Sequence, residues 1–202
     1  MNILPYNDNT LESIARTIIT RYNPALLRYP APIPVEEIIE KVYGLTIEFQ
    51  CIRKNGRVLG ETIFEDAMVP IYDRRSGEGY KVVAVKAGTI FIDVSLMNKR
   101  GNGRYRWTCA HELAHWVEHR EYFKQLGETA AMTKITRSSE VDRTIERQAD
   151  RLTNYFLMPK GTVKMAFFRN RTADDISATL AEIFNVSRQA MGIRLKEMGL
   201  LI

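Results

Sequence analysis

The stretch Arg106-Trp107-Thr108-Cys109-Ala110-His111-Glu112-Leu113-Ala114-His115 contains the pattern H-E-x-x-H. It lies within a segment, Arg104 to Arg120, that we predict to form one α-helix. Two histidines four positions apart share one face of a helix, about one turn (~6 Å) apart, so His111 and His115 can bind one tetrahedral cation. Glu112 is rotated to the side of this face, where its carboxylate can reach a water molecule bound to the metal.

A third protein ligand is needed, because a catalytic zinc ion usually has three and keeps one position for water. His119 lies eight residues after His111, about 12 Å along the helix axis, which is too far to share a cation. Cys109 would face away from the two histidines, and Glu118 also lies too far along the axis. We therefore expect His119 to be a surface or packing histidine and Cys109 a small buried residue.

The better candidate for the third ligand lies downstream, in a second predicted helix from Val141 to Leu157. Glu146 and Asp150 lie one turn apart there, and the apolar stripe of this helix can pack against the first helix. Glu146 would then complete a His₂Glu set, as in thermolysin-type enzymes. Asp150 can accept a hydrogen bond from a ligand histidine and fix its tautomer. The alternative is a solvated face on which these carboxylates pair with Arg147 or Arg151.

Such a site predicts hydrolysis of amide bonds. Zinc lowers the pKa of its bound water to about 7 and polarises a carbonyl group, while Glu112 takes the proton of that water and returns it to the leaving amine. Two imidazoles and one carboxylate suit zinc, although the sequence does not exclude manganese. Tyr122 and Tyr155 are both candidates for stabilising the oxyanion, and nothing in the sequence selects between them.

The chain as a whole, residues 1–202, is predicted to form a single domain with an α+β fold. Its sheet lies early in the chain and its helices late. Short β-branched and aromatic runs predict four or five strands of a small, largely antiparallel sheet: Leu45 to Phe49, Val58 to Phe64, Ala67 to Tyr72, Tyr80 to Lys86 and Thr89 to Val94. The helices predicted besides the two described above are Thr10 to Tyr22, Val35 to Val42, Asp174 to Phe184 and Ser187 to Met198.

The composition excludes several classes of protein. With 45% hydrophobic and 26% charged residues, the chain is neither disordered nor fibrous. No stretch approaches the roughly 18 apolar residues of a membrane span, and the N-terminus lacks the pattern of an export signal. Two cysteines fit a reducing compartment, so we expect a cytoplasmic protein. The net charge of +5 permits contact with nucleic acid but does not require it.

These motifs together resemble the ImmA/IrrE family of bacterial metallo-endopeptidases. Residues 106–115 are similar to its R-F-T-x-A-H-E-x-x-H signature, and residues 145–150 and 156–159 to its E-x-x-A-[DN] and L-L-M-P motifs, with similarity from about Ala31 onward. The resemblance implies zinc binding by His111, His115 and Glu146, with Glu112 catalytic. It also implies that the substrate is a helix-turn-helix repressor, encoded by a neighbouring gene, that controls a mobile element or a stress response.

The chain departs from the family signature in two places. Trp107 replaces the usual phenylalanine, which leaves the chemistry unchanged. The segment from Glu121 to Asp142 is long and polar, so we expect substrate access there to differ from that in relatives. As in other metallopeptidases of this type, a strand at the sheet edge can hold an extended substrate, and Thr89 to Val94 is the candidate by position. The alternative is that this run is a core strand.

The C-terminal residues 172–202 resemble a helix-turn-helix. Asn185 can adopt the left-handed conformation at the turn, and Ser187 can cap the second helix. A DNA reader would present Arg188 and Gln189 to base edges. A DNA-binding transcription regulator with a structural or degenerate metal site is therefore the rival hypothesis, and an inactive protein-binding module is a third. The small excess of positive charge in this region favours the enzyme.

Overall fold

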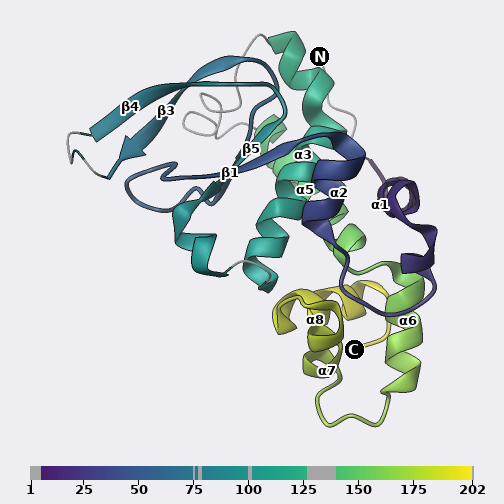
Figure 1. The fold of residues 1–202 in the computed structure, drawn as a ribbon. Helices are drawn as coiled ribbons and strands as arrows, with labels where there is room; N and C mark the ends of the chain where they lie inside the picture. The colour runs from purple at the N-terminus through teal and green to yellow at the C-terminus, as the bar shows by residue number, and fades with distance from the viewer. Residues whose placement is uncertain (1–5, 75, 77–78, 100–101, 127–139, 202) are drawn as a thin grey trace.

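A computed structural model describes residues 6–74, 76, 79–99, 102–126 and 140–201 (Figure 1). The protein has the predicted α+β fold, in which the strands precede most of the helices. The helices are α1 Asp8–Tyr22, α2 Val35–Tyr43, α3 Gly103–Leu126, α5 Glu140–Leu157, α6 Lys160–Arg169, α7 Ile176–Phe184 and α8 Arg188–Glu197, with 3₁₀ turns η1 Pro24–Leu27 and η2 Val94–Lys99. The strands are β1 Thr46–Gln50, β2 Gly60–Thr62, β3 Ala67–Asp73, β4 Gly79–Val85 and β5 Thr89–Asp93.

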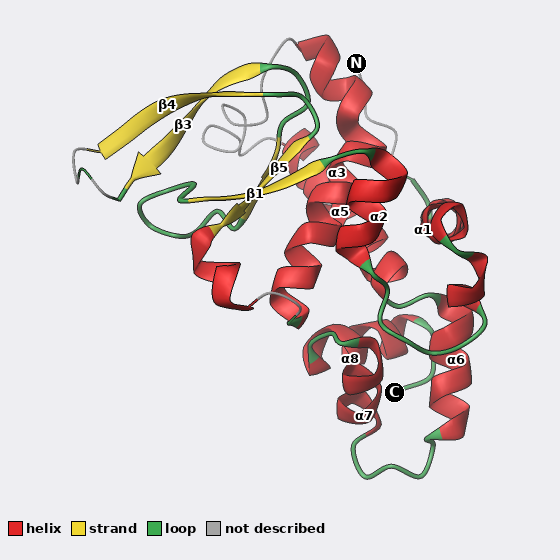
Figure 2. Ribbon diagram, in the orientation of Figure 1, coloured by secondary structure: helices red, strands yellow, loops and turns green. Residues whose placement is uncertain are grey.

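The described strands form two small sheets rather than one (Figure 2). In the first, the order is β1-β5-β2, with β1 parallel and β2 antiparallel to β5. In the second, β3 and β4 pair as an antiparallel hairpin with Ala67 opposite Val85. Two of the three pairings are antiparallel, as predicted. The hairpin packs in a second, small apolar cluster, in which Val69 and Ile71 of β3 join Phe91 of β5.

The expectation that residues 89–94 form an edge strand is wrong. β5 is the central strand of its sheet, and all five of its residues are buried. Ile90 and Ile92 contribute to the main core, whereas Phe91 points to the other side and packs with the hairpin. With both faces and both edges covered, β5 has no side on which a substrate can lie. The edge strand that contacts α3 is β2, which is much shorter than the predicted Val58 to Phe64.

The main core lies where α3 and α5 pack against each other and against α1 and α2 (Figure 1). Gly44 ends α2 in the left-handed conformation (φ 63°), which glycine adopts without strain. α3 continues past the predicted end at Arg120 to Leu126, and Phe123 in this extension stacks on Phe64 at 4.6 Å. α3 is therefore held along most of its length by buried apolar contacts.

The C-terminal helices α6, α7 and α8 group at the end of the molecule away from the strands (Figure 1). Asn185 adopts the left-handed conformation and the Ser187 side chain caps α8, as the helix-turn-helix pattern predicts. The turn between α7 and α8 contacts the beginning of α3, where Arg106 Nε donates to the Asn185 carbonyl at 3.3 Å. This helix pair thus helps to fix the start of the helix that carries His111. Among the described residues, no helix is both long and apolar enough to cross a bilayer.

Candidate metal centre

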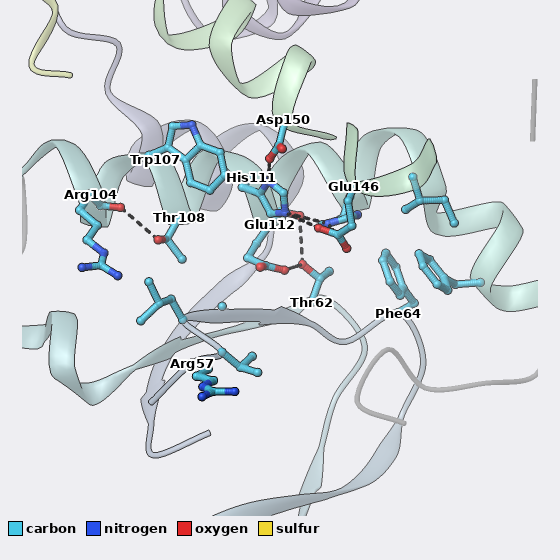
Figure 3. Close-up of a pocket in the computed structure, with 16 residues that line it drawn as sticks. Arg57, Thr62, Phe64, Arg104, Trp107, Thr108, His111, Glu112, Glu146 and Asp150 are labelled. Carbon is cyan, nitrogen blue, oxygen red and sulfur yellow. Dashed lines mark hydrogen bonds and ion pairs between the residues drawn. The ribbon is translucent and has the colours of Figure 1, made fainter. Parts of the chain in front are cut away.

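The structure brings together the three side chains that the sequence predicts to meet. Ligand atoms of His111, His115 and Glu146 all lie within 4.8 Å of one another. The Nε2 atoms of the two histidines are 3.0 Å apart, and the Glu146 carboxylate oxygens lie 3.3 Å from His111 Nε2 and 3.5 Å from His115 Nε2 (Figure 3). Both imidazoles are buried, whereas the Glu146 side chain is about half exposed and leaves the cluster open toward the cleft.

These separations fit a tetrahedral metal ion. Metal–ligand bonds of about 2.0–2.2 Å at tetrahedral angles place neighbouring donor atoms about 3.3 to 3.5 Å apart. The observed distances between the donor atoms, 3.0 to 3.5 Å, are close to this value. Two imidazole nitrogens and a carboxylate are ligands that zinc accepts. The residues present therefore fit a divalent cation with one coordination position left for water.

Both histidines are oriented by a second contact on their other ring nitrogen. His111 Nδ1 lies 3.1 Å from Asp150 Oδ1, as predicted for Asp150. His115 Nδ1 lies 3.1 Å from Nδ1 of His119, whose Nε2 lies 3.2 Å from Gln148 Oε1. Such contacts hold the ring so that its Nε2 faces the ligand position. The α5 helix therefore supplies Glu146 and also supports both of the histidines on α3.

His119 is a packing histidine and not a surface one. It is 1% exposed, and burial lowers its pKa to about 3, so the ring is neutral at physiological pH. Burial also lowers the pKa of His115. A neutral imidazole is the form that binds a metal, so the buried surroundings favour metal over proton at this position. Cys109 is buried, as expected.

Glu112 lies beside the cluster and contacts the edge strand β2. Its carboxylate accepts a hydrogen bond of 2.8 Å from the Thr62 hydroxyl (Figure 3). Gly60 of the same strand lies directly against this carboxylate, because a β-carbon added at Gly60 would be 2.5 Å from Glu112 Oε1. The sequence does not predict either contact, because fifty residues separate Thr62 from Glu112 and no local pattern links them.

The cluster lines a cleft with a volume of about 610 Å³. Arg57 and Arg104 lie toward one end of the cleft and Phe64 toward the other (Figure 3). Phe123 and Ile145, which also line the cleft, pack with Phe64. Neither predicted oxyanion residue is among the residues that line it. Tyr155 is 2% exposed and packs under the Arg194 guanidinium, away from the cluster.

The residues 127–139, which carry most of the long polar segment, lie outside the described residues, so the prediction about substrate access there stays a prediction.

Glu118 is another acidic residue of this helix, and its burial predicts how the stability of the protein changes with pH. Its carboxylate oxygens are buried and, among the described residues, have no hydrogen-bond partner. Burial raises the pKa of Glu118 from its ordinary value of 4.5 to about 8. Between these two values the folded protein holds a proton that the unfolded chain loses, so stability falls as the pH rises through this window.

We therefore expect a Glu118→Gln variant to melt at a higher temperature than the wild type above about pH 8 and to differ least below about pH 4.5. Because Gln is neutral at every pH, the difference between the two melting temperatures isolates the contribution of this one carboxyl group. Thermal denaturation followed by circular dichroism at several pH values measures this difference. A difference that does not change with pH would show that Glu118 is not buried in its protonated form.

A buried helix with H-E-x-x-H, facing a carboxylate from a second helix, is the arrangement that defines a class of metallopeptidases. The comparison with known families agrees with this class. The chain matches the family model of the IrrE N-terminal-like domain, peptidase family M78, over residues 61–196, and therefore belongs to this metallopeptidase family. The match contains the three residues of the metal cluster, and it confirms the resemblance to the ImmA/IrrE family. No curated protein matches the chain at a significant level.

Proposed function

We propose that this protein is a zinc-dependent endopeptidase that cleaves a regulatory protein, a helix-turn-helix repressor of a mobile element or a stress response. The observation that carries the zinc site is the convergence of two buried imidazoles and one carboxylate on a single point of the cleft. Membership of the M78 family supports the reaction class. The identity of the substrate comes from the resemblance to the ImmA/IrrE enzymes. For the protein itself, a cytoplasmic location remains the expectation from the sequence.

In this proposal each residue has one role. His111, His115 and Glu146 would hold the zinc ion, which when bound would lower the pKa of the attacking water and polarise the scissile carbonyl. The Glu112 carboxylate accepts the proton of the water and passes it to the leaving amine. The Thr62 hydroxyl keeps this carboxylate in place with the hydrogen bond described above. Asp150 fixes the ring of His111.

The cleft supports a substrate that is an extended peptide. β2 and the residues before it line the cleft. This edge strand, and not β5, is therefore the one that can pair with an extended substrate. The guanidinium groups of Arg57 and Arg104 favour an acidic side chain on one side of the scissile bond. On the other side, the wall of the cleft at Phe64 and Phe123 favours a large apolar side chain.

Incubation with the repressor encoded next to this gene tests the proposal. We expect the zinc-loaded protein to cut the repressor at one or a few peptide bonds, which mass measurement of the fragments identifies. Cleavage should stop with 1,10-phenanthroline, which chelates zinc, and continue with 1,7-phenanthroline, an isomer that does not chelate. Persistence of cleavage in the chelator would show that the reaction does not need the metal. An intact repressor in all samples would contradict the proposed substrate.

Direct DNA binding by α7 and α8 is the alternative function, and the contacts of these helices support it less. Arg188, which would approach the bases, forms an ion pair of 2.7 Å with Asp175 at the start of α7. The turn between the helices is occupied by its contact with Arg106 of α3. Both observations fit a helix pair that supports the metal-binding helix.

A further inference from the structure

His119 and Gln148 neither hold the metal nor move a proton in the mechanism described above, yet both are buried polar residues. Their exposed fractions are 1% and 5%, and His115 between them and the cluster is 3% exposed. The three side chains form a continuous series of contacts, from Gln148 Oε1 to His119 and from His119 to His115. Buried polar groups are expensive to keep unless their hydrogen bonds are made, so this series calls for an explanation.

We propose that His119 and Gln148 are positioning residues that set the tautomer of His115, so that the lone pair of its Nε2 atom points at the metal. The inference rests on the proposed zinc site. These two residues would support a metal ligand and would take no part in the reaction, because neither of them reaches the position of the metal.

The direction of the hydrogen bonds follows from the acceptor at the end of the series. Gln148 Oε1 can only accept, so the facing Nε2 of His119 carries the proton. A neutral imidazole has one N–H group, so His119 Nδ1 accepts and His115 Nδ1 donates to it. His115 then has no proton on Nε2, and this atom presents a lone pair to the cluster. The opposite orientation of the Gln148 amide would place a proton on His115 Nε2, which excludes the metal.

His111 is set in the same way by a different group. The Asp150 carboxylate lies 3.1 Å from His111 Nδ1 and favours a proton on that atom, which leaves Nε2 with its lone pair. The two Nε2 atoms, 3.0 Å apart, then present two lone pairs to each other beside the Glu146 carboxylate. A cation between them turns this repulsion into attraction. The relay through His119 therefore does for His115 what Asp150 does for His111, without adding a charge in the core.

Two pairs of variants separate this role from simple packing. His119→Phe keeps a ring of similar size but removes the acceptor, whereas His119→Asn keeps an acceptor at the position of Nδ1. Gln148→Leu removes the terminal acceptor, whereas Gln148→Glu keeps it. Cys109→Ala is the matched control, because Cys109 is also buried on α3 but is not among the residues that line the cleft.

The first measurement is zinc affinity, obtained by competition with a chromogenic chelator on the intact protein. We expect His119→Phe and Gln148→Leu to bind zinc about ten- to hundred-fold more weakly than the wild type, as loss of an outer-shell partner does elsewhere. His119→Asn and Gln148→Glu should recover most of this loss, and Cys109→Ala should leave zinc affinity unchanged. Melting temperatures of the zinc-free proteins report how much each variant disturbs packing.

The second measurement is the nitrogen NMR signal of His115 in the zinc-loaded protein. We expect a protonated Nδ1 with the shift of a hydrogen-bonded donor, and a change of that shift in His119→Phe but not in Cys109→Ala. If His119→Phe lowers the melting temperature as Cys109→Ala does and keeps wild-type zinc affinity, the positioning role is wrong. If the wild type itself binds no zinc, the proposed function fails instead, so the two failures are distinct.

Discussion

A Glu112→Gln variant is expected to bind zinc as tightly as the wild type and to hydrolyse the substrate about 10³-fold more slowly. Gln has nearly the shape of Glu, but its amide cannot accept a proton from the attacking water. The Thr62 hydroxyl can still donate to the amide oxygen, so the buried hydrogen bond to β2 is kept. The measurements are kcat on the cleaved substrate and the amount of zinc bound by the purified variant.

Glu118→Gln is the control, because it makes the same chemical change six residues along the same helix. Its pKa of about 8 means that Glu118 is mostly protonated at neutral pH, so an amide there changes little. We expect this variant to keep wild-type activity. If Glu112→Gln retained most of its activity, the proton would have another acceptor and the role given to Glu112 would be wrong. If it lost zinc, its effect would be on the metal cluster.

The metal cluster was predictable because its geometry is mostly local. The spacing of His111 and His115 fixes their common helix face, and the spacing of Glu146 and Asp150 does the same on the second helix. The same rise per residue excluded His119 as a ligand. What the sequence could not supply is the set of contacts between segments. Thr62 touches Glu112 only because β2 packs on α3, and no periodicity in either segment reports that contact.

The error about β5 has a physical cause that the sequence did contain. Within this strand, Ile90-Phe91-Ile92 is a continuous apolar run without alternation, which is typical of a strand buried on both faces. An edge strand beside a cleft would show polar residues on one face. The parallel pairing of β1 with β5 could not be predicted, because three strands lie between them in the chain. Of these, β2 pairs with the other edge of β5, and β3 and β4 form a separate sheet.

A Gly60→Ala variant is expected to fold, to bind zinc and to lose roughly 10²- to 10³-fold in kcat. The added β-carbon would lie 2.5 Å from Oε1, 2.7 Å from Cγ and 2.9 Å from Cδ of Glu112. Three atoms of one side chain cannot all be this close to a methyl group, so the Glu112 carboxylate must move. Because a side chain moves at less cost than a strand, the change should displace the proposed base and leave the fold intact. Gly60 does not have a positive φ, so alanine brings no backbone strain at this position.

Gly161→Ala distinguishes this effect from the general consequences of replacing a glycine. A β-carbon at Gly161, in α6, meets nothing within 4 Å, so this variant should keep full activity and gain up to about 1 kcal/mol in stability. Gly60 also lines the cleft, so kcat at saturating substrate together with the zinc content of Gly60→Ala tests the link through Glu112. If Gly60→Ala binds as much zinc as the wild type and has a low kcat, the loss of activity is due to the displaced carboxylate. A variant with unchanged kcat would mean that the carboxylate can reach the attacking water from a second position, and the tight contact between β2 and α3 would then have no part in catalysis.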